Sequence, residues 1–122
     1  MATIYYEAED CYSVTDASFP LKISVKIGDG QGGAYLIFNG AELIGANAPG
    51  MLKLMAATDE WITISATIKD KLDETNWTSI SIFFDDPSKH DPVKFGPYKR
   101  EVPTHLDTVV YTIRLKIIKP TS

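Results

Sequence analysis

The chain has 122 residues, a length that suits a single domain spanning 1–122 around one hydrophobic core. Apolar residues make up 44% and charged residues 23%, which is typical of a globular rather than a disordered chain. The net charge of −4 argues against a sequence-independent nucleic-acid partner, because such a protein needs a face rich in Lys and Arg. The single cysteine, Cys11, excludes a fold built on intramolecular disulfides.

The start of the chain lacks the basic segment and the apolar segment of a signal peptide. No apolar run approaches the roughly 20 residues that a membrane-spanning helix needs. We therefore expect a cytoplasmic protein without membrane insertion. A secreted protein whose signal peptide had been removed would show the same features.

The first expected strand covers 2–8, with Ile4, Tyr6 and Ala8 on one face. A polar loop, 9–20, is expected to follow it. The alternation of apolar and polar residues in 21–27 then predicts a strand with one buried face.

The stretch 21–45 as a whole is expected to form a three-stranded meander. A glycine cluster at 28–33 supplies the first reversal, and Asn39-Gly40 is a strong hairpin signal for the second. The expected strands on either side of Asn39-Gly40 are 34–38 and 41–45.

The segment 51–57 is ambiguous, because its residues favour helix and Pro49 could stand near a helix start. Leu52, Leu54 and Ala56 nevertheless alternate with Met51, Lys53 and Met55. We expect a strand here because the neighbouring segments are all strands.

Three further segments alternate clearly and predict strands at 61–69, 77–85 and 108–119. A charged loop, 70–76, separates the first two of them. The alternation also predicts buried core residues: Ile23, Val25, Ile62, Ile64, Ile80, Ile82, Ile113 and Leu115.

The segment 86–107 contains four prolines and no clear periodicity. So long a stretch without regular structure is unusual, so it is either functional or hides a short edge strand, with 98–102 as the candidate. Phe95, Tyr98 and Arg100 are of the residue types enriched at interface centres, and we expect them to contact a partner or a second copy. The alternative is that the two aromatic rings pin the segment to the fold.

About eight short strands separated by turn signals predict an all-β protein, a single-domain antiparallel β-sandwich of the immunoglobulin-like or jelly-roll kind. No fixed-period repeat and no convincing helix is apparent.

Gly28, Gly30 and Gly33 match the G-x-G-x-x-G pattern of dinucleotide-binding folds. That motif must open a helix whose N-terminus holds the pyrophosphate, whereas a strand is expected here after Gly33. We interpret the glycines as a turn, and we expect no cofactor.

The histidine and carboxylate pairs suggest no metal site, because the two histidines are far apart and stand outside any metal-binding motif. Asp85, Asp86 and Asp91 could supply oxygen ligands to calcium, but the sequence has no calcium-binding loop motif. Cys11 has no residue beside it that would activate a nucleophile. The pairs are His90 with Asp91 and His105 with Asp107.

Trp61 and Trp77 each open an expected strand and lie on the side of that strand that carries its polar residues. Each ring could therefore face solvent or a partner. The two strands are expected to be neighbours that pair antiparallel, which places the rings at opposite ends of the hairpin, about 26 Å apart, so that they could not form one platform for sugar rings. Between them runs a stripe of hydroxyl side chains, which is either a solvated face or a covered surface: Thr63, Ser65, Thr67, Ser79 and Ser81. The glycosylation sequon 76–78 is most simply a chance match.

These features predict a non-enzymatic protein-interaction or assembly module, including self-association. The alternative is a carbohydrate-binding module that uses an exposed tryptophan with loop Asp and Asn residues. An enzyme is not expected, since no catalytic constellation is present in the sequence.

Overall fold

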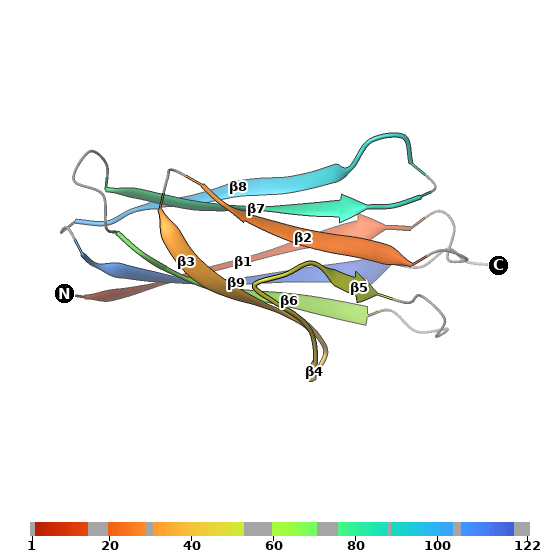
Figure 1. The fold of residues 1–122 in the computed structure, drawn as a ribbon, viewed down its shortest axis with the longest axis horizontal. Helices are drawn as coiled ribbons and strands as arrows, with labels where there is room; N and C mark the ends of the chain where they lie inside the picture. Colours follow the sequence, from red (N-terminus) through yellow and green to blue (C-terminus); the bar gives the residue numbers. More distant parts are fainter. Residues whose placement is uncertain are drawn as a thin grey trace.

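The computed structural model of the chain describes residues 2–14, 20–28, 31–52, 60–70, 76–87, 89–103 and 106–118. These residues form two β-sheets that pack face to face (Figure 1). The five-stranded sheet has the order β1-β9-β6-β3-β4, and the four-stranded sheet has the order β5-β2-β7-β8. The predicted β-sandwich is therefore confirmed, with nine strands in the described residues rather than about eight.

The strands of the five-stranded sheet are β1 (Thr3–Ser13), β3 (Gly32–Asn39), β4 (Glu42–Ala46), β6 (Glu60–Lys69) and β9 (Thr108–Ile118). Those of the four-stranded sheet are β2 (Leu21–Ile27), β5 (Gly50–Leu52), β7 (Trp77–Asp85) and β8 (Val93–Glu101). Among the described residues there is no helix of the length and apolarity needed to cross a membrane.

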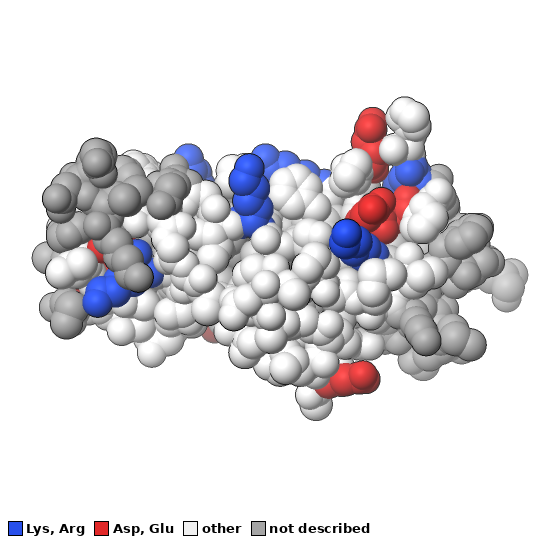
Figure 2. All heavy atoms as spheres, viewed as in Figure 1, with Lys and Arg blue, Asp and Glu red and all other residues white. Residues whose placement is uncertain are grey.

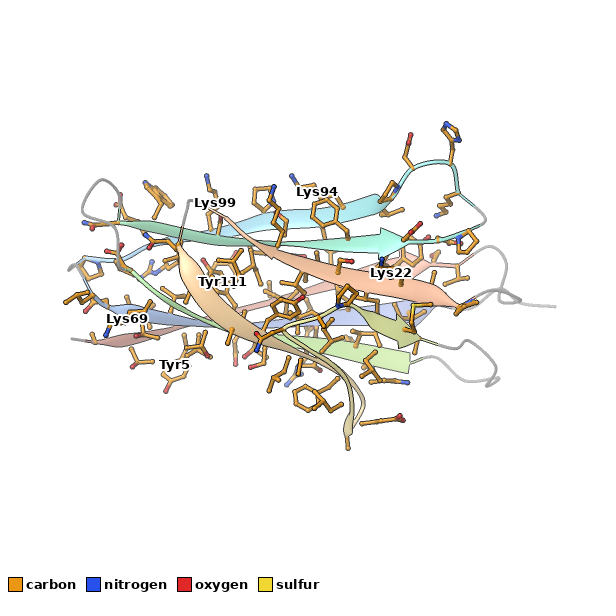
Figure 3. The ribbon with its side chains drawn as sticks, viewed as in Figure 1. Tyr5, Lys22, Lys69, Lys94, Lys99 and Tyr111 are labelled. Carbon is orange, nitrogen blue, oxygen red and sulfur yellow. The ribbon has the colours of Figure 1, made fainter. Side chains whose placement is uncertain are left out.

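The core lies between the sheets and is built from alternate residues of β2, β6, β7 and β9, as the period of two requires. Of the eight residues predicted to be buried, Val25 is half-buried and the other seven are fully buried. Tyr111 of β9 lies between the sheets (Figure 3), and its hydroxyl donates a hydrogen bond of 3.0 Å to the Thr78 carbonyl oxygen of β7. This bond links the two sheets through the core.

The predicted three-stranded meander is wrong in one respect, because β2 and β3 belong to different sheets. β2 pairs with β7 and β5, whereas β3 pairs with β6 and β4. The glycine-rich segment carries the chain from one sheet to the other: Gly28 N donates to the Ser79 carbonyl oxygen at 2.9 Å before the crossing. The Asn39-Gly40 hairpin is confirmed, with a φ of 58° at Gly40.

β1 is longer than the sequence indicates, because residues 9–13 continue the strand instead of starting a loop. They pair with β9 in parallel, so one strand pair departs from the antiparallel pattern. Tyr12 is buried and donates a hydrogen bond to Asp86, whereas Asp10 has the same parity but is exposed and accepts a hydrogen bond from Tyr98. Because polar residues occupy positions where apolar ones are expected, the alternation of apolar and polar residues does not predict this part of the strand.

The segment 86–107 does hide an edge strand, and β8 is longer than the predicted 98–102 and begins earlier. Of the ambiguous segment 51–57, Met51 and Leu52 belong to β5, while the remainder lies outside the described residues. Most of the expected loop 70–76 also lies outside them.

Candidate functional site

β8 carries the three residues expected at an interface: Phe95, Tyr98 and Arg100. A bulge opposite β7 falls at Gly96 and Pro97, which are joined by a cis peptide bond, and Gly96 has a φ of 90°. The extra residue in the bulge lets Phe95 and Tyr98 both pack against the core although they are three positions apart. Arg100 is exposed at the rim of the sandwich.

Phe95 and Tyr98 connect β8 to β1 along one side of the sandwich. The ring centroids of Phe95 and Tyr12 are 6.2 Å apart, and those of Tyr98 and Tyr6 are 6.3 Å apart. The Tyr98 hydroxyl donates a hydrogen bond of 3.3 Å to Asp10. These contacts give both rings a role inside the fold, and their contact with a partner stays a prediction.

Two of the tyrosines on this side of the sandwich are held in their neutral form. Burial, the charge of Asp10 and the hydrogen bond to it raise the pKa of Tyr98 to about 12. Burial and the hydrogen bond to Asp86 raise the pKa of Tyr12 well above its ordinary value. Both phenols therefore act as hydrogen-bond donors, not as bases, near neutral pH.

The carboxylates considered as calcium ligands do not share one environment. Asp86 is 1% exposed and hydrogen-bonded, whereas Asp85, Asp91 and His90 are exposed. Among the described residues, no group of three or more His, Cys, Asp and Glu side chains could hold a metal ion. His105 lies outside the described residues.

Trp61 and Trp77 lie on opposite faces of the molecule, because β6 and β7 belong to different sheets. The prediction that their strands are paired neighbours is wrong, and the two rings are separated by the whole sandwich instead. Both are substantially exposed, at 43% and 42%. The hydroxyl stripe divides in the same way, with Thr63, Ser65 and Thr67 on one outer face and Ser79 and Ser81 on the other.

The outer face of the five-stranded sheet is rich in apolar side chains. Strand register places side chains in adjacent rows across this face, namely Tyr5–Val110–Thr67–Ala34, Glu7–Thr112–Ser65–Leu36 and Glu9–Arg114–Thr63–Phe38–Leu43. Five large exposed hydrophobic side chains lie on it: Tyr5, Leu36, Leu43, Trp61 and Ile118. Figure 3 shows Tyr5 pointing from β1 away from the sandwich.

Charged side chains on this face belong to β1, to β9 and to the end of β6. Arg114 and Glu9 form an exposed ion pair of 3.5 Å, and Lys69 ends β6. Figure 2 shows this face only edge-on, along its lower border, but the strand bounds give no charged residue in β3 and only Lys69 at the outward positions of β6. The half of the face formed by β3 and β6 is therefore apolar or hydroxylic.

The outer face of the four-stranded sheet has a different character, because lysines from β2 and β8 flank β7. Figure 3 shows Lys94 and Lys99 pointing from β8 away from the other sheet. The Lys94 Nζ lies 5.9 Å from the Phe83 ring centroid, and the Lys99 Nζ lies 5.7 Å from that of Trp77. The sequence interpretation missed this basic face, since the two strands that form it are far apart in the chain.

A hollow of about 330 Å³ lies at the other side of the sandwich, by the β3–β4 hairpin and β5. Its lining consists of Asn39, Glu42, Ile44, Met51 and Leu52. It offers one carboxylate and one amide beside apolar side chains. A nucleophile paired with a base is not among these lining residues.

Comparisons of this chain with protein-family models, with curated proteins and with solved structures found no match.

Proposed function

We propose that this protein is a non-enzymatic interaction module that self-associates through the outer face of the five-stranded sheet. The observation that carries the proposal is the gathering of Tyr5, Leu36, Leu43 and Trp61 on one sheet face whose β3 half bears no described charge. Exposed apolar patches of more than a few hundred Å² usually mark interaction sites.

The size of this face supports a second copy as the occupant. Five strands spaced about 4.8 Å apart and about 30 Å long cover 600 to 700 Å² per copy. Two copies stacked face to face would bury twice that area, which reaches the size of a standard stable interface. Two sheets can pack in this way about 10 Å apart, as the two sheets of one chain already do.

The charges at the rim also suit a copy of the same surface. Glu7 and Glu9 of β1 supply acidic groups, while Lys69 and Lys116 supply basic ones. A face that carries both signs at its border can pair opposite charges with a copy, whereas a face of one sign would repel it.

Sedimentation velocity over a range of protein concentrations tests the proposal. The wild type should sediment as a dimer, and Leu36→Lys should shift it to a monomer because a lysine would be buried at the centre of the interface. Met51→Lys is the matched control, since Met51 is an exposed apolar residue of the other sheet, at 52%. It should leave the dimer intact.

The exposed thiol of Cys11 provides a second measurement, since it lies on the same face beside Lys116. Its rate of maleimide labelling should fall as the protein concentration rises into the dimer range. A wild type that stays monomeric at about 100 μM, far above a typical specific dissociation constant, would contradict self-association. Dimers that survive Leu36→Lys but not Met51→Lys would place the interface on the other sheet.

A carbohydrate-binding module is the second candidate, favoured by the exposed Trp77 with Lys99 beside its ring. Neither candidate function requires a cofactor or a metal. The cytoplasm remains the expected compartment.

A further inference from the structure

The middle of the outer face of the four-stranded sheet is positively charged. Strand register places Lys26 beside Ser81, Lys99 beside Ser79 and Lys94 beside Phe83. The described carboxylates of this face stand at its two ends, where Asp85 lies beside Lys22 and Glu101 lies beside Trp77. Three lysines therefore surround the centre of β7, and no described carboxylate lies between them.

Strand geometry sets the spacing of these three lysines. β2 and β8 lie on either side of β7, so they are about 10 Å apart. Lys94 and Lys99 pair with β7 residues four positions apart, which corresponds to about 13 Å along the strand. The three lysines thus form a triangle with sides of about 12 Å around two small serines.

Each lysine of β8 has an aromatic ring as its neighbour on β7. The Lys94 ammonium lies over Phe83 and the Lys99 ammonium lies over Trp77. An aromatic plane packs against the apolar C–H face of a sugar ring, and an ammonium beside it can pair with a carboxylate or sulfate on the same sugar. The partly exposed hydroxyl of Ser81 supplies a further hydrogen-bonding group, whereas Ser79 is buried.

We infer that this face, defined by Lys26, Trp77, Phe83, Lys94 and Lys99, binds an anionic polysaccharide. The inference rests on the carbohydrate-binding candidate and names its ligand class. A chain of net charge −4 has no general attraction for a polyanion, so the three lysines must act together with the aromatic rings beside them. An acidic sugar offers an anionic group and an apolar ring face on the same unit, which suits this combination of lysine and aromatic side chains.

The test uses the full chain with Trp61→Phe, which leaves Trp77 as the only tryptophan and so as the reporter. Polygalacturonate and heparin are titrated while the fluorescence of Trp77 is followed, and both are expected to change it with saturation. Methyl-esterified polygalacturonate has the same sugar backbone without its charge. It should bind at least about tenfold more weakly, as the loss of two or three exposed ion pairs implies.

Two charge-matched double variants locate the site. Lys94→Gln with Lys99→Gln should weaken polygalacturonate binding about tenfold. Lys89→Gln with Arg100→Gln removes the same charge outside both this face and the proposed dimer face, and should change binding less than twofold. Equal losses in the two variants would overturn the inference, since they would show attraction to total charge alone.

The remaining outcomes separate this inference from the functions on which it depends. Equal binding of the methyl ester would overturn the anionic class while leaving carbohydrate binding in place. Tighter binding of poly(dT) or of phosphatidylserine vesicles than of either polysaccharide would overturn it in favour of another anion. If none of the polysaccharides changes the fluorescence of Trp77, both the inference and the carbohydrate candidate are overturned. The proposed dimerisation is then still judged by sedimentation.

Discussion

Ile64 and Thr63 are neighbours in β6 and lie on opposite sides of the sheet. Ile64 is fully buried, whereas Thr63 is on the outer face and only partly covered. Ile64→Ala should lower the free energy of unfolding by about 2–5 kcal/mol, because it removes buried methyl groups and leaves a cavity. Thr63→Ala should cost less than about 1 kcal/mol. Urea unfolding of both variants checks this, and equal losses would mean that the two faces are wrongly assigned.

Tyr98 makes stability depend on pH in the alkaline range. Burial, together with the charge and hydrogen bond of Asp10, raises its pKa from 10.0 to about 12. In the unfolded chain the phenol ionises first, so its stabilising contribution is complete below pH 10 and is lost as pH rises through about 12. Tyr98→Phe should therefore make the free energy of unfolding fall less steeply between those pH values.

Urea unfolding at several pH values from 9 to 12 measures this slope. Phe95→Leu serves as the control, because it weakens packing at the same side of the sandwich without changing a titrating group. It should lower stability by a similar amount at each pH. A slope in Tyr98→Phe equal to that of the wild type would contradict the role given to Tyr98.

At the scale of elements, β3 approaches β6 so closely that one of two adjacent glycines is required. A Cβ atom built on Gly33 would lie against the Thr67 carbonyl oxygen, well inside van der Waals contact. A Cβ atom on Gly32 would meet nothing within 4 Å. Gly33→Ala should therefore destabilise the protein by about 1–3 kcal/mol, and Gly32→Ala should be close to neutral.

The midpoint of thermal unfolding of the two alanine variants measures this difference. Because both substitutions change glycine to alanine within one strand, their effect on the unfolded chain is the same. Similar midpoints for the two variants would show that β3 can move away from β6 at no cost.

The sequence pattern predicts some strands more clearly than others. β6, β7 and β9 alternate apolar inward residues with polar outward ones, and their bounds follow from the pattern to within a residue. β1 and β8 do not, because β1 carries the exposed Asp10 at a position with inward parity and β8 contains the bulge at Gly96 and Pro97. A bulge changes which face each later residue occupies, so a simple period of two fails across it.

For the whole molecule, pairing of distant segments dominates the fold. β1 pairs with β9 and β2 pairs with β7, so the first and last strands are neighbours and most of the chain must be present before either sheet is complete. Such a topology folds slowly, since loop closure must precede the contacts. Stopped-flow tryptophan fluorescence should show a main refolding phase between milliseconds and seconds, and complete refolding in microseconds would contradict this picture.

The sequence by itself determined the fold class and most of the core, because alternation depends only on which side of a strand each residue faces. It also determined the hairpin at Asn39-Gly40, since turn chemistry is local. It could not determine that β2 and β3 lie in different sheets, that Trp61 and Trp77 face opposite ways, or that Lys26, Lys94 and Lys99 share a surface. Those facts depend on which strands pair, and strand pairing is set by long-range packing of the whole chain, which no local pattern records.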